Sequence, residues 1–202
     1  MISPKFARKT LDKGADGLVL VRSGAGGHTG EYAMLPFIDE VRRFFEGPLI
    51  VGGGIGSGRA IRAVENLGAD FAYLGTRFLA GRETMISQEY REMVWTSAME
   101  GLIALARHHR CIGKLDARQC RGCGYSIEDM KDAAKLDFSG DMGAGSKAWK
   151  HVWSAGQGVG GITKPEAVAD VVATPVAEYH QAVTDQSQGS RFGTVPSQKD
   201  GA

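Results

Sequence analysis

Apolar runs and amphipathic stretches alternate along the first half of the chain. Three runs are short and continuously apolar: Leu18–Val21, Leu49–Val51 and Phe71–Leu74. Short runs of this kind, without alternation of apolar and polar residues, are typical of parallel strands that are buried on both faces. The pattern therefore predicts three strands of a parallel sheet.

Helical spacing of apolar residues fills the segments between these runs. It marks Pro36–Phe45 and Ser57–Leu67, the second of which begins with a serine suited to cap a helix. A further helix is expected from Thr84 to about Val94, and Gly14 and Gly68 suit the left-handed position that closes a helix. Helices and strands that alternate with short connections indicate consecutive βα units of an α/β fold.

Beyond residue 95 the regular pattern stops. Residues 96–162 are expected to form an irregular extension with glycine-rich stretches. A C-terminal helix is predicted over 163–184, opened by a capping box of Thr163 and Glu166 and kinked or broken at Pro175. The polar segment 185–202 is expected to be a disordered tail.

The charge balance and the apolar runs limit the class of protein. The chain has 24 basic and 23 acidic residues, which gives no electrostatic footprint for nucleic acid or for an anionic membrane. The apolar runs are far shorter than a membrane span, and the first residues do not form a signal peptide. Three closely spaced cysteines argue against a secreted disulfide scaffold, so a cytoplasmic protein is expected.

Glycine-rich segments follow each predicted strand, where parallel α/β folds carry their functional residues. The first segment, 23–30, contains His28, an acid or base near neutral pH beside glycines that allow close approach of a flat ligand. The segments 51–58 and 74–78 match the two strand-end turns from which barrels build a phosphate site. The alternatives are an incidental histidine in a loop and a pair of tight turns that bind nothing.

Five motifs, taken in order, resemble the nitronate monooxygenases, formerly called 2-nitropropane dioxygenases. The resemblance covers residues 1 to about 100 and about 124 to 182. The motifs are Gly14–Gly17, Ala25–Gly30, Gly52–Ile55, Gly75–Phe78 and Trp153–Gly158.

The resemblance implies an FMN-dependent TIM (β/α)8 barrel in which residues 1–95 are the last three βα units, strands six to eight. Three strands cannot close a barrel, so the chain is expected to be the C-terminal portion of such an enzyme. His28 matches the family's active-site histidine beside the flavin ring. The cofactor-binding residues implied by the match are Gly26, Gly27, Gly53, Gly54, Gly75, Thr76 and, in a loop over the cofactor, Gln157.

The implied reaction is oxidation of an alkyl nitronate by flavin and dioxygen, which yields a carbonyl compound and nitrite. The implied partners are a small nitronate or nitroalkane and dioxygen, and a homo-oligomer stays open. One alternative is a flavin-dependent enoyl-ACP reductase of the same barrel type, which shares the histidine loop and both glycine turns. Another is a non-catalytic barrel fragment that does not hold flavin by itself.

Residues 101–123 depart from the family's pattern and contain all three cysteines. Cys111, Cys120 and Cys123, with His108 or His109, could supply four metal ligands, but a convincing second ligand pair is lacking, so no metal site is assigned. A local frameshift is a second hypothesis. The neighbouring reading frame over 114–119 can encode Asn-Trp-Met-Arg-Ala-Ser, which resembles the family's sequence after the corresponding helix.

Overall fold

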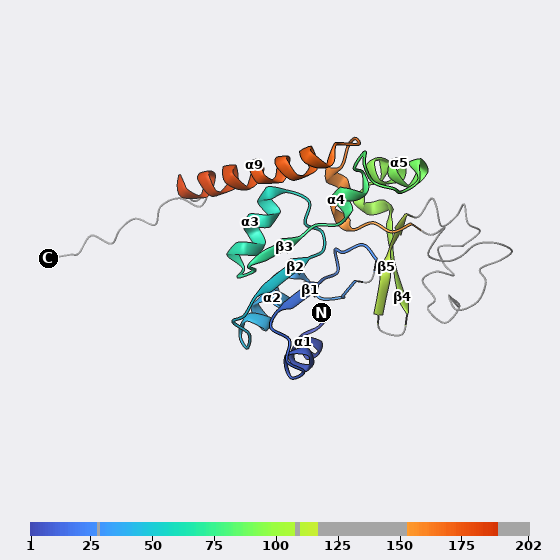
Figure 1. Cartoon of the computed structure of the whole chain (residues 1–202). Helices are drawn as coiled ribbons and strands as arrows, with labels where there is room; N and C mark the ends of the chain where they lie inside the picture. Colours follow the sequence, from blue (N-terminus) through green and yellow to red (C-terminus); the bar gives the residue numbers. More distant parts are fainter. Residues whose placement is uncertain (28, 108–109, 117–152, 190–202) are drawn as a thin grey trace.

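The computed structural model describes residues 1–27, 29–107, 110–116 and 153–189. Its centre is a parallel sheet of three strands in the order β1 (Leu18–Val21), β2 (Leu49–Gly52) and β3 (Phe71–Tyr73). The strands are the three that the apolar runs predict, and Figure 1 shows them side by side at the centre of the molecule. Parallel pairing of successive strands confirms the predicted α/β class.

Helices precede and connect these strands. The first three are α1 (Pro4–Leu11), α2 (Met34–Arg42) and α3 (Gly58–Asn66). Ser57 caps α3 as predicted, because its side chain accepts a hydrogen bond from the Ala60 N–H. The prediction for Gly14 and Gly68 is also confirmed, with φ of 86° and 98° just after α1 and α3.

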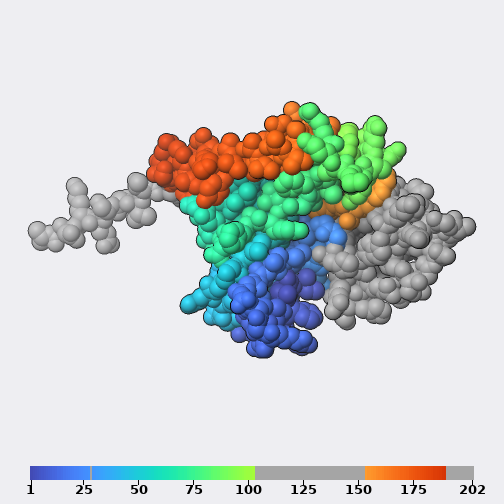
Figure 2. All heavy atoms as spheres, in the orientation of Figure 1, coloured from blue at the N-terminus to red at the C-terminus, as the bar shows by residue number. Residues whose placement is uncertain are grey.

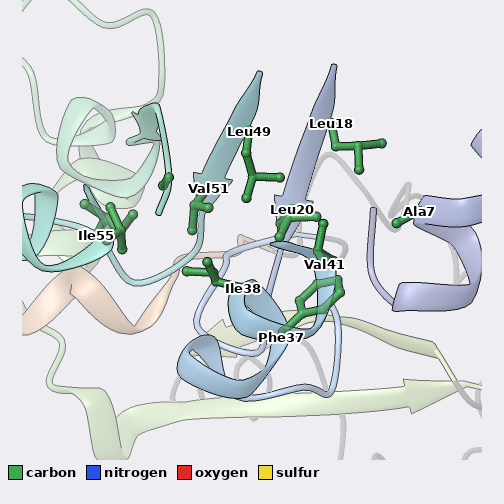
Figure 3. Packing of buried hydrophobic residues seen from close by; sticks show 11 residues of the cluster. Ala7, Leu18, Leu20, Phe37, Ile38, Val41, Leu49, Val51 and Ile55 are labelled. Atoms are coloured by element: carbon green, nitrogen blue, oxygen red, sulfur yellow. The ribbon is translucent and has the colours of Figure 1, made fainter. Parts of the chain in front are cut away.

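The hydrophobic core lies between the sheet and α2. Leu18 and Leu20 of β1 and Leu49 and Val51 of β2 point to the same side of the sheet (Figure 3). There they pack with apolar residues of the helices that flank this face, among them Ala7, Phe37, Ile38, Val41 and Val64. Burial of this one face gives the three strands their fixed register.

Large apolar side chains on the opposite face of the sheet are exposed. Val19, Phe71 and Tyr73 point to that side and are 39%, 62% and 62% exposed. The prediction of strands buried on both faces is therefore wrong for this chain taken alone. The residues are apolar enough for burial on both sides, but the described helices lie against only one side.

A second group of elements follows β3. It begins with the short α4 (Thr76–Leu79) and continues with α5 (Gln88–Thr96), which starts later than the expected Thr84. The Thr84 hydroxyl instead donates to the Gly81 carbonyl at 2.7 Å and closes the turn after α4, and Ser87 caps α5.

An antiparallel hairpin lies within the segment that was expected to be irregular. After the 3-10 turn η1 (Met99–Gly101), β4 (Leu102–Arg107) pairs with β5 (Arg110–Asp116). Cys111 lies on β5, whereas Cys120, Cys123, His108 and His109 lie outside the described residues. The metal and frameshift hypotheses for this region stay untested.

The chain returns through the 3-10 turn η2 (Gln157–Gly161) to the helix α9 (Val168–Ser187). This helix begins five residues later than predicted and runs on into the expected tail, whose remainder from residue 190 lies outside the described residues. Glu166 does not form the predicted capping box. It pairs with Arg77 at 3.5 Å, and its carbonyl accepts a hydrogen bond from the Arg82 N–H, so the segment before α9 is held against α4 and the turn after it.

Pro175 lies inside α9 and does not break it. In Figures 1 and 2, α9 extends across the molecule beside α3. The contact is close because α3 begins with Gly58: a Cβ there would lie 2.1 Å from the Pro175 carbonyl oxygen. Among the helices that the structure describes, none has the length and hydropathy needed to span a membrane.

Candidate functional site

A pocket of about 400 Å³ opens at the carboxyl ends of the three parallel strands. It brings together six of the residues that the sequence assigns to the cofactor: Gly26, Gly27, Gly53, Gly54, Gly75 and Thr76. The volume falls within the range of about 300–1,000 Å³ that is usual for ligand and cofactor pockets. Three separate strand-end loops therefore converge on one cavity.

Of the two other predicted site residues, Gln157 does not line the pocket, and for His28 the placement is not described. His28 lies outside the described residues, although its neighbours Gly26 and Gly27 line the cavity. The side chain of Gln157 is exposed, and its backbone N–H donates to the Gly24 carbonyl at 2.9 Å. The pocket is lined instead by Ser154 and Gly158 from the same glycine-rich segment.

The turn after β2 has a conformation that suits glycine. Gly53 and Gly54 have φ of 110° and 75°, which side chains rarely adopt. The Gly53 carbonyl accepts a hydrogen bond from Arg22 Nη2 at 3.1 Å. Because the peptide bond is trans, the Gly54 N–H points away from Arg22, and no described residue accepts it.

Thr76 follows β3 and begins α4. Its hydroxyl oxygen accepts a hydrogen bond from the Gly156 N–H at 2.8 Å, so its own hydroxyl hydrogen stays available as a donor. Its backbone N–H has no acceptor within the described part of the chain. Thr76 can therefore hold the Gly156 backbone and donate to a ligand in the pocket at the same time.

The start of α3 follows the pocket residue Ile55, but two of its amides are occupied by acceptors of the chain itself. The Gly58 N–H donates to Glu178 Oε2 of α9 at 2.7 Å, and the Ala60 N–H donates to Ser57. The Gly58 and Ala60 amides are therefore not available to an anion, whereas the Gly54 and Thr76 amides, which belong to residues that line the pocket, remain free.

Tyr90 of α5 also lines the pocket, and the sequence did not indicate it. Its hydroxyl donates to the Ser154 carbonyl at 2.5 Å and accepts from the Ser154 N–H at 3.2 Å. Its ring stacks on Trp153 with 5.1 Å between centroids. Burial raises the pKa of the Tyr90 hydroxyl, so Tyr90 is neutral near pH 7.

Close packing of glycines fixes residues 153–161, the returning segment, against the loop that follows β1. A Cβ on Gly26 would lie 2.7 Å from the Gly156 nitrogen, and one on Gly156 would lie 2.8 Å from the Gly24 oxygen. A Cβ on Gly27 or Gly75 would meet nothing within 4 Å. Gly26 is therefore required by the packing of two backbones, whereas Gly27 and Gly75 leave open space for a ligand.

None of the described residues that line the pocket is an Asp, Glu, His, Lys or Arg. The nearby Arg77 donates to the Gly56 carbonyl and is paired with Glu166. Arg22 is 2% exposed and has no carboxylate within 4 Å among the described residues. Burial lowers the pKa of the Arg22 guanidinium to about 10, so it remains a cation at neutral pH.

Free backbone amides, a threonine hydroxyl and a buried cation fit a phosphate group, and the glycine-lined cavity beside them fits a flat ring. The fold and the pocket therefore define an α/β protein with a candidate ligand site at the carboxyl ends of its parallel strands. The chain belongs to the nitronate monooxygenase family, whose model matches residues 2–178. Curated relatives of this chain carry the name nitronate monooxygenase.

Individual relatives agree with the family model. A nitronate monooxygenase from Paraburkholderia phytofirmans is 29% identical over 87% of this chain and 52% of its own length. A nitroalkane oxidase structure from Streptomyces ansochromogenes is similar with a TM-score of 0.69 and 25% identity, over 92% of this chain and 58% of that one. FabK from Thermotoga maritima has a TM-score of 0.76 at 22% identity, over 93% of this chain and 62% of that one, which shows a shared fold.

The chain is much shorter than these proteins. It spans between 30% and 52% of the length of the first two curated relatives that it matches. The activities named for the relatives belong to those longer proteins.

Proposed function

We propose that this chain binds FMN and carries the flavin-phosphate site of a nitronate monooxygenase, which oxidises alkyl nitronates with dioxygen to carbonyl compounds and nitrite. The observation that carries the proposal is that Gly53, Gly54, Gly75 and Thr76 line one cavity at the strand ends. Family membership and the nitroalkane oxidase relative support this kind of reaction.

In this proposal the Gly54 and Thr76 amides and the Thr76 hydroxyl hold the flavin phosphate. Gly27 and Gly75 leave room for the ring, and Tyr90 holds the returning segment in place at the pocket wall. The bound flavin supplies the electron transfer between substrate and dioxygen. His28 removes a proton from a neutral nitroalkane or positions the anionic nitro group.

The test begins with the colour of the purified full chain. Uptake of added FMN, followed by oxygen consumption and nitrite release with an alkyl nitronate, is the expected result. The alternative, an enoyl-ACP reductase, would instead oxidise NAD(P)H with an enoyl thioester. A chain that takes up no FMN would contradict the proposal and favour a non-catalytic fragment.

We also propose that β1, β2 and β3 are the last three strands of a TIM barrel. The apolar exposed face with Val19, Phe71 and Tyr73 supports this, because that face would line the barrel interior. Co-expression with the first five βα units of the Paraburkholderia relative should give a complex and tighter FMN binding. A Phe71→Glu variant is the matched control and should not associate.

A further inference from the structure

Arg22 is a buried cation to which neither the family motifs nor the pocket lining assigns a role. It is one of the largest fully buried side chains of the described residues. Its Nε has no hydrogen-bond partner among them, and its Nη2 bonds only to the Gly53 carbonyl. A buried guanidinium that has no carboxylate partner among the described residues is unfavourable for folding, so its presence at this position needs a different explanation.

The position of Arg22 relative to the glycine turn supplies that explanation. Arg22 lies directly after β1, and its carbonyl accepts hydrogen bonds from Ala25 and Thr29, which fix the backbone at this point. The guanidinium therefore lies one peptide group behind the wall of the pocket. The guanidinium holds the Gly53 carbonyl oxygen toward Arg22, so the N–H of the same peptide group, that of Gly54, points away from Arg22.

We infer that Arg22 is a positioning and charge-balancing residue of an anion site. It fixes the Gly53–Gly54 peptide and offsets the negative charge of a phosphate monoester bound at Gly54 and Thr76. The inference rests on the proposed function, since it takes the phosphate to be that of FMN. It predicts that the positive charge of Arg22 stays unbalanced until the anion is bound, because the described residues that line the pocket include no charged side chain.

The experiment compares FMN with riboflavin, which has the same ring but no phosphate, by titration of flavin fluorescence. Arg22→Met and Arg22→Gln remove the charge and should each weaken FMN binding at least about tenfold. Riboflavin binding should stay within about twofold of wild type if only the phosphate contact is lost. Arg22→Lys keeps the charge and should retain most of the preference for FMN.

The matched control is Arg43→Met, which changes the net charge equally at an exposed position of the same sheet-helix unit. It should leave both affinities unchanged. Thermal unfolding without ligand adds a second readout: Arg22→Met should melt at the same temperature as wild type or higher, because an unpaired buried charge is gone. A purely structural arginine would give a lower melting temperature and would weaken both flavins together, and that result overturns the inference.

Unchanged FMN affinity in both Arg22→Met and Arg22→Gln overturns it as well. If Arg22→Met does not fold, Arg22→Gln decides, because it keeps a polar group for the Gly53 carbonyl. If the wild-type chain binds neither flavin, the proposed function fails, and inorganic phosphate becomes the probe. Phosphate should then raise the melting temperature of wild type and not that of the charge-removing variants, and equal shifts overturn the inference.

Discussion

The Tyr90 hydroxyl forms hydrogen bonds with both the carbonyl oxygen and the N–H of Ser154, at 2.5 and 3.2 Å. These two residues lie 64 positions apart in the sequence. The pair joins α5 to the segment that closes one side of the pocket, and stacking of Tyr90 on Trp153 strengthens the same junction. One side chain therefore couples the stability of the returning segment to the shape of the candidate cofactor site.

Tyr90→Phe should lower the free energy of unfolding by about 1 kcal/mol, because two buried hydrogen bonds are lost while the ring stacking remains. It should also weaken FMN binding, since Ser154 lines the pocket. Urea unfolding and flavin titration measure the two effects. Tyr32→Phe is the control, because Tyr32 is exposed and its hydroxyl has no hydrogen bond within the described structure. Equal effects of the two variants would argue against the junction.

The Thr76 hydroxyl is predicted to form two hydrogen bonds, one accepted from the Gly156 N–H and one donated to the flavin phosphate. Thr76→Val should weaken FMN binding at least about tenfold, because both the Gly156 contact and a donor to the phosphate are lost. Thr76→Ser keeps the hydroxyl and should stay within about threefold of wild type. Riboflavin should be affected less than FMN. The same loss for both flavins would mean that Thr76 only packs the returning segment.

His28 should affect turnover more than cofactor binding. If the imidazole acts as a base or positions the nitro group, His28→Ala should lower kcat by about 10²–10⁴ while FMN affinity stays near wild type. His180→Ala, on the exposed side of α9, is the matched control and should leave turnover unchanged. Nitrite release with an alkyl nitronate is the measurement. Normal turnover in His28→Ala would show that the histidine has no part in catalysis.

The sequence predicted correctly those elements of the fold that are determined by residues close to one another in the chain. Each strand is a continuous apolar run, and Ser57 stands where a helix cap is needed, so local chemistry was sufficient. The predicted start of α9 was wrong because Glu166, which a capping box would use, is instead paired with Arg77 of α4, a helix distant in sequence. The hairpin of β4 and β5 was missed because its pairing joins two segments with no regular pattern.

The candidate site also combines features that the local sequence indicates with features that depend on residues distant in the chain. The glycine turns were recognisable from their spacing, and the structure brings six of the predicted residues to one cavity. The sequence did not indicate that Tyr90 belongs to the site, because its partner is remote in sequence. Only its position on the apolar side of α5, beside Met93 and Val94, could be read from the helical spacing. The burial of Arg22 could not be predicted, because an arginine after a strand is ordinarily at the surface.

Gly58 should be indispensable for the packing of α9 on α3. In Gly58→Ala the new methyl group would lie 2.1 Å from the Pro175 oxygen and 2.2 Å from the Tyr179 nitrogen, so one of the helix backbones must move. The expected loss of unfolding free energy is about 1–3 kcal/mol. Gly160→Ala is the control, because a Cβ there meets nothing within 4 Å. Urea unfolding of both variants decides, and equal midpoints would contradict this packing.

Asp70 should make stability depend on pH in the acid range. The Leu49 N–H donates to its carboxylate at 2.7 Å and Arg42 pairs with it at 2.7 Å, and these contacts lower the pKa of Asp70. An unfolded aspartate has a pKa of about 3.9, so between that value and the lower folded pKa the unfolded chain binds more protons. The contribution is therefore complete above about pH 4–5 and is lost as the pH falls through the folded pKa.

Asp70→Asn should accordingly be less stable than wild type at pH 7, and the difference should shrink as the pH falls below about 4, because the unfolded wild-type chain then takes up a proton that the folded carboxylate, with its lowered pKa, binds only at lower pH. Asp39→Asn is the matched control, since Asp39 is exposed and its side chain has no ion pair among the described residues. Urea unfolding at pH 7, 5 and 3 gives the comparison. A difference between wild type and Asp70→Asn that stays constant across this range would show that the aspartate acts through hydrogen bonding that does not require its charge.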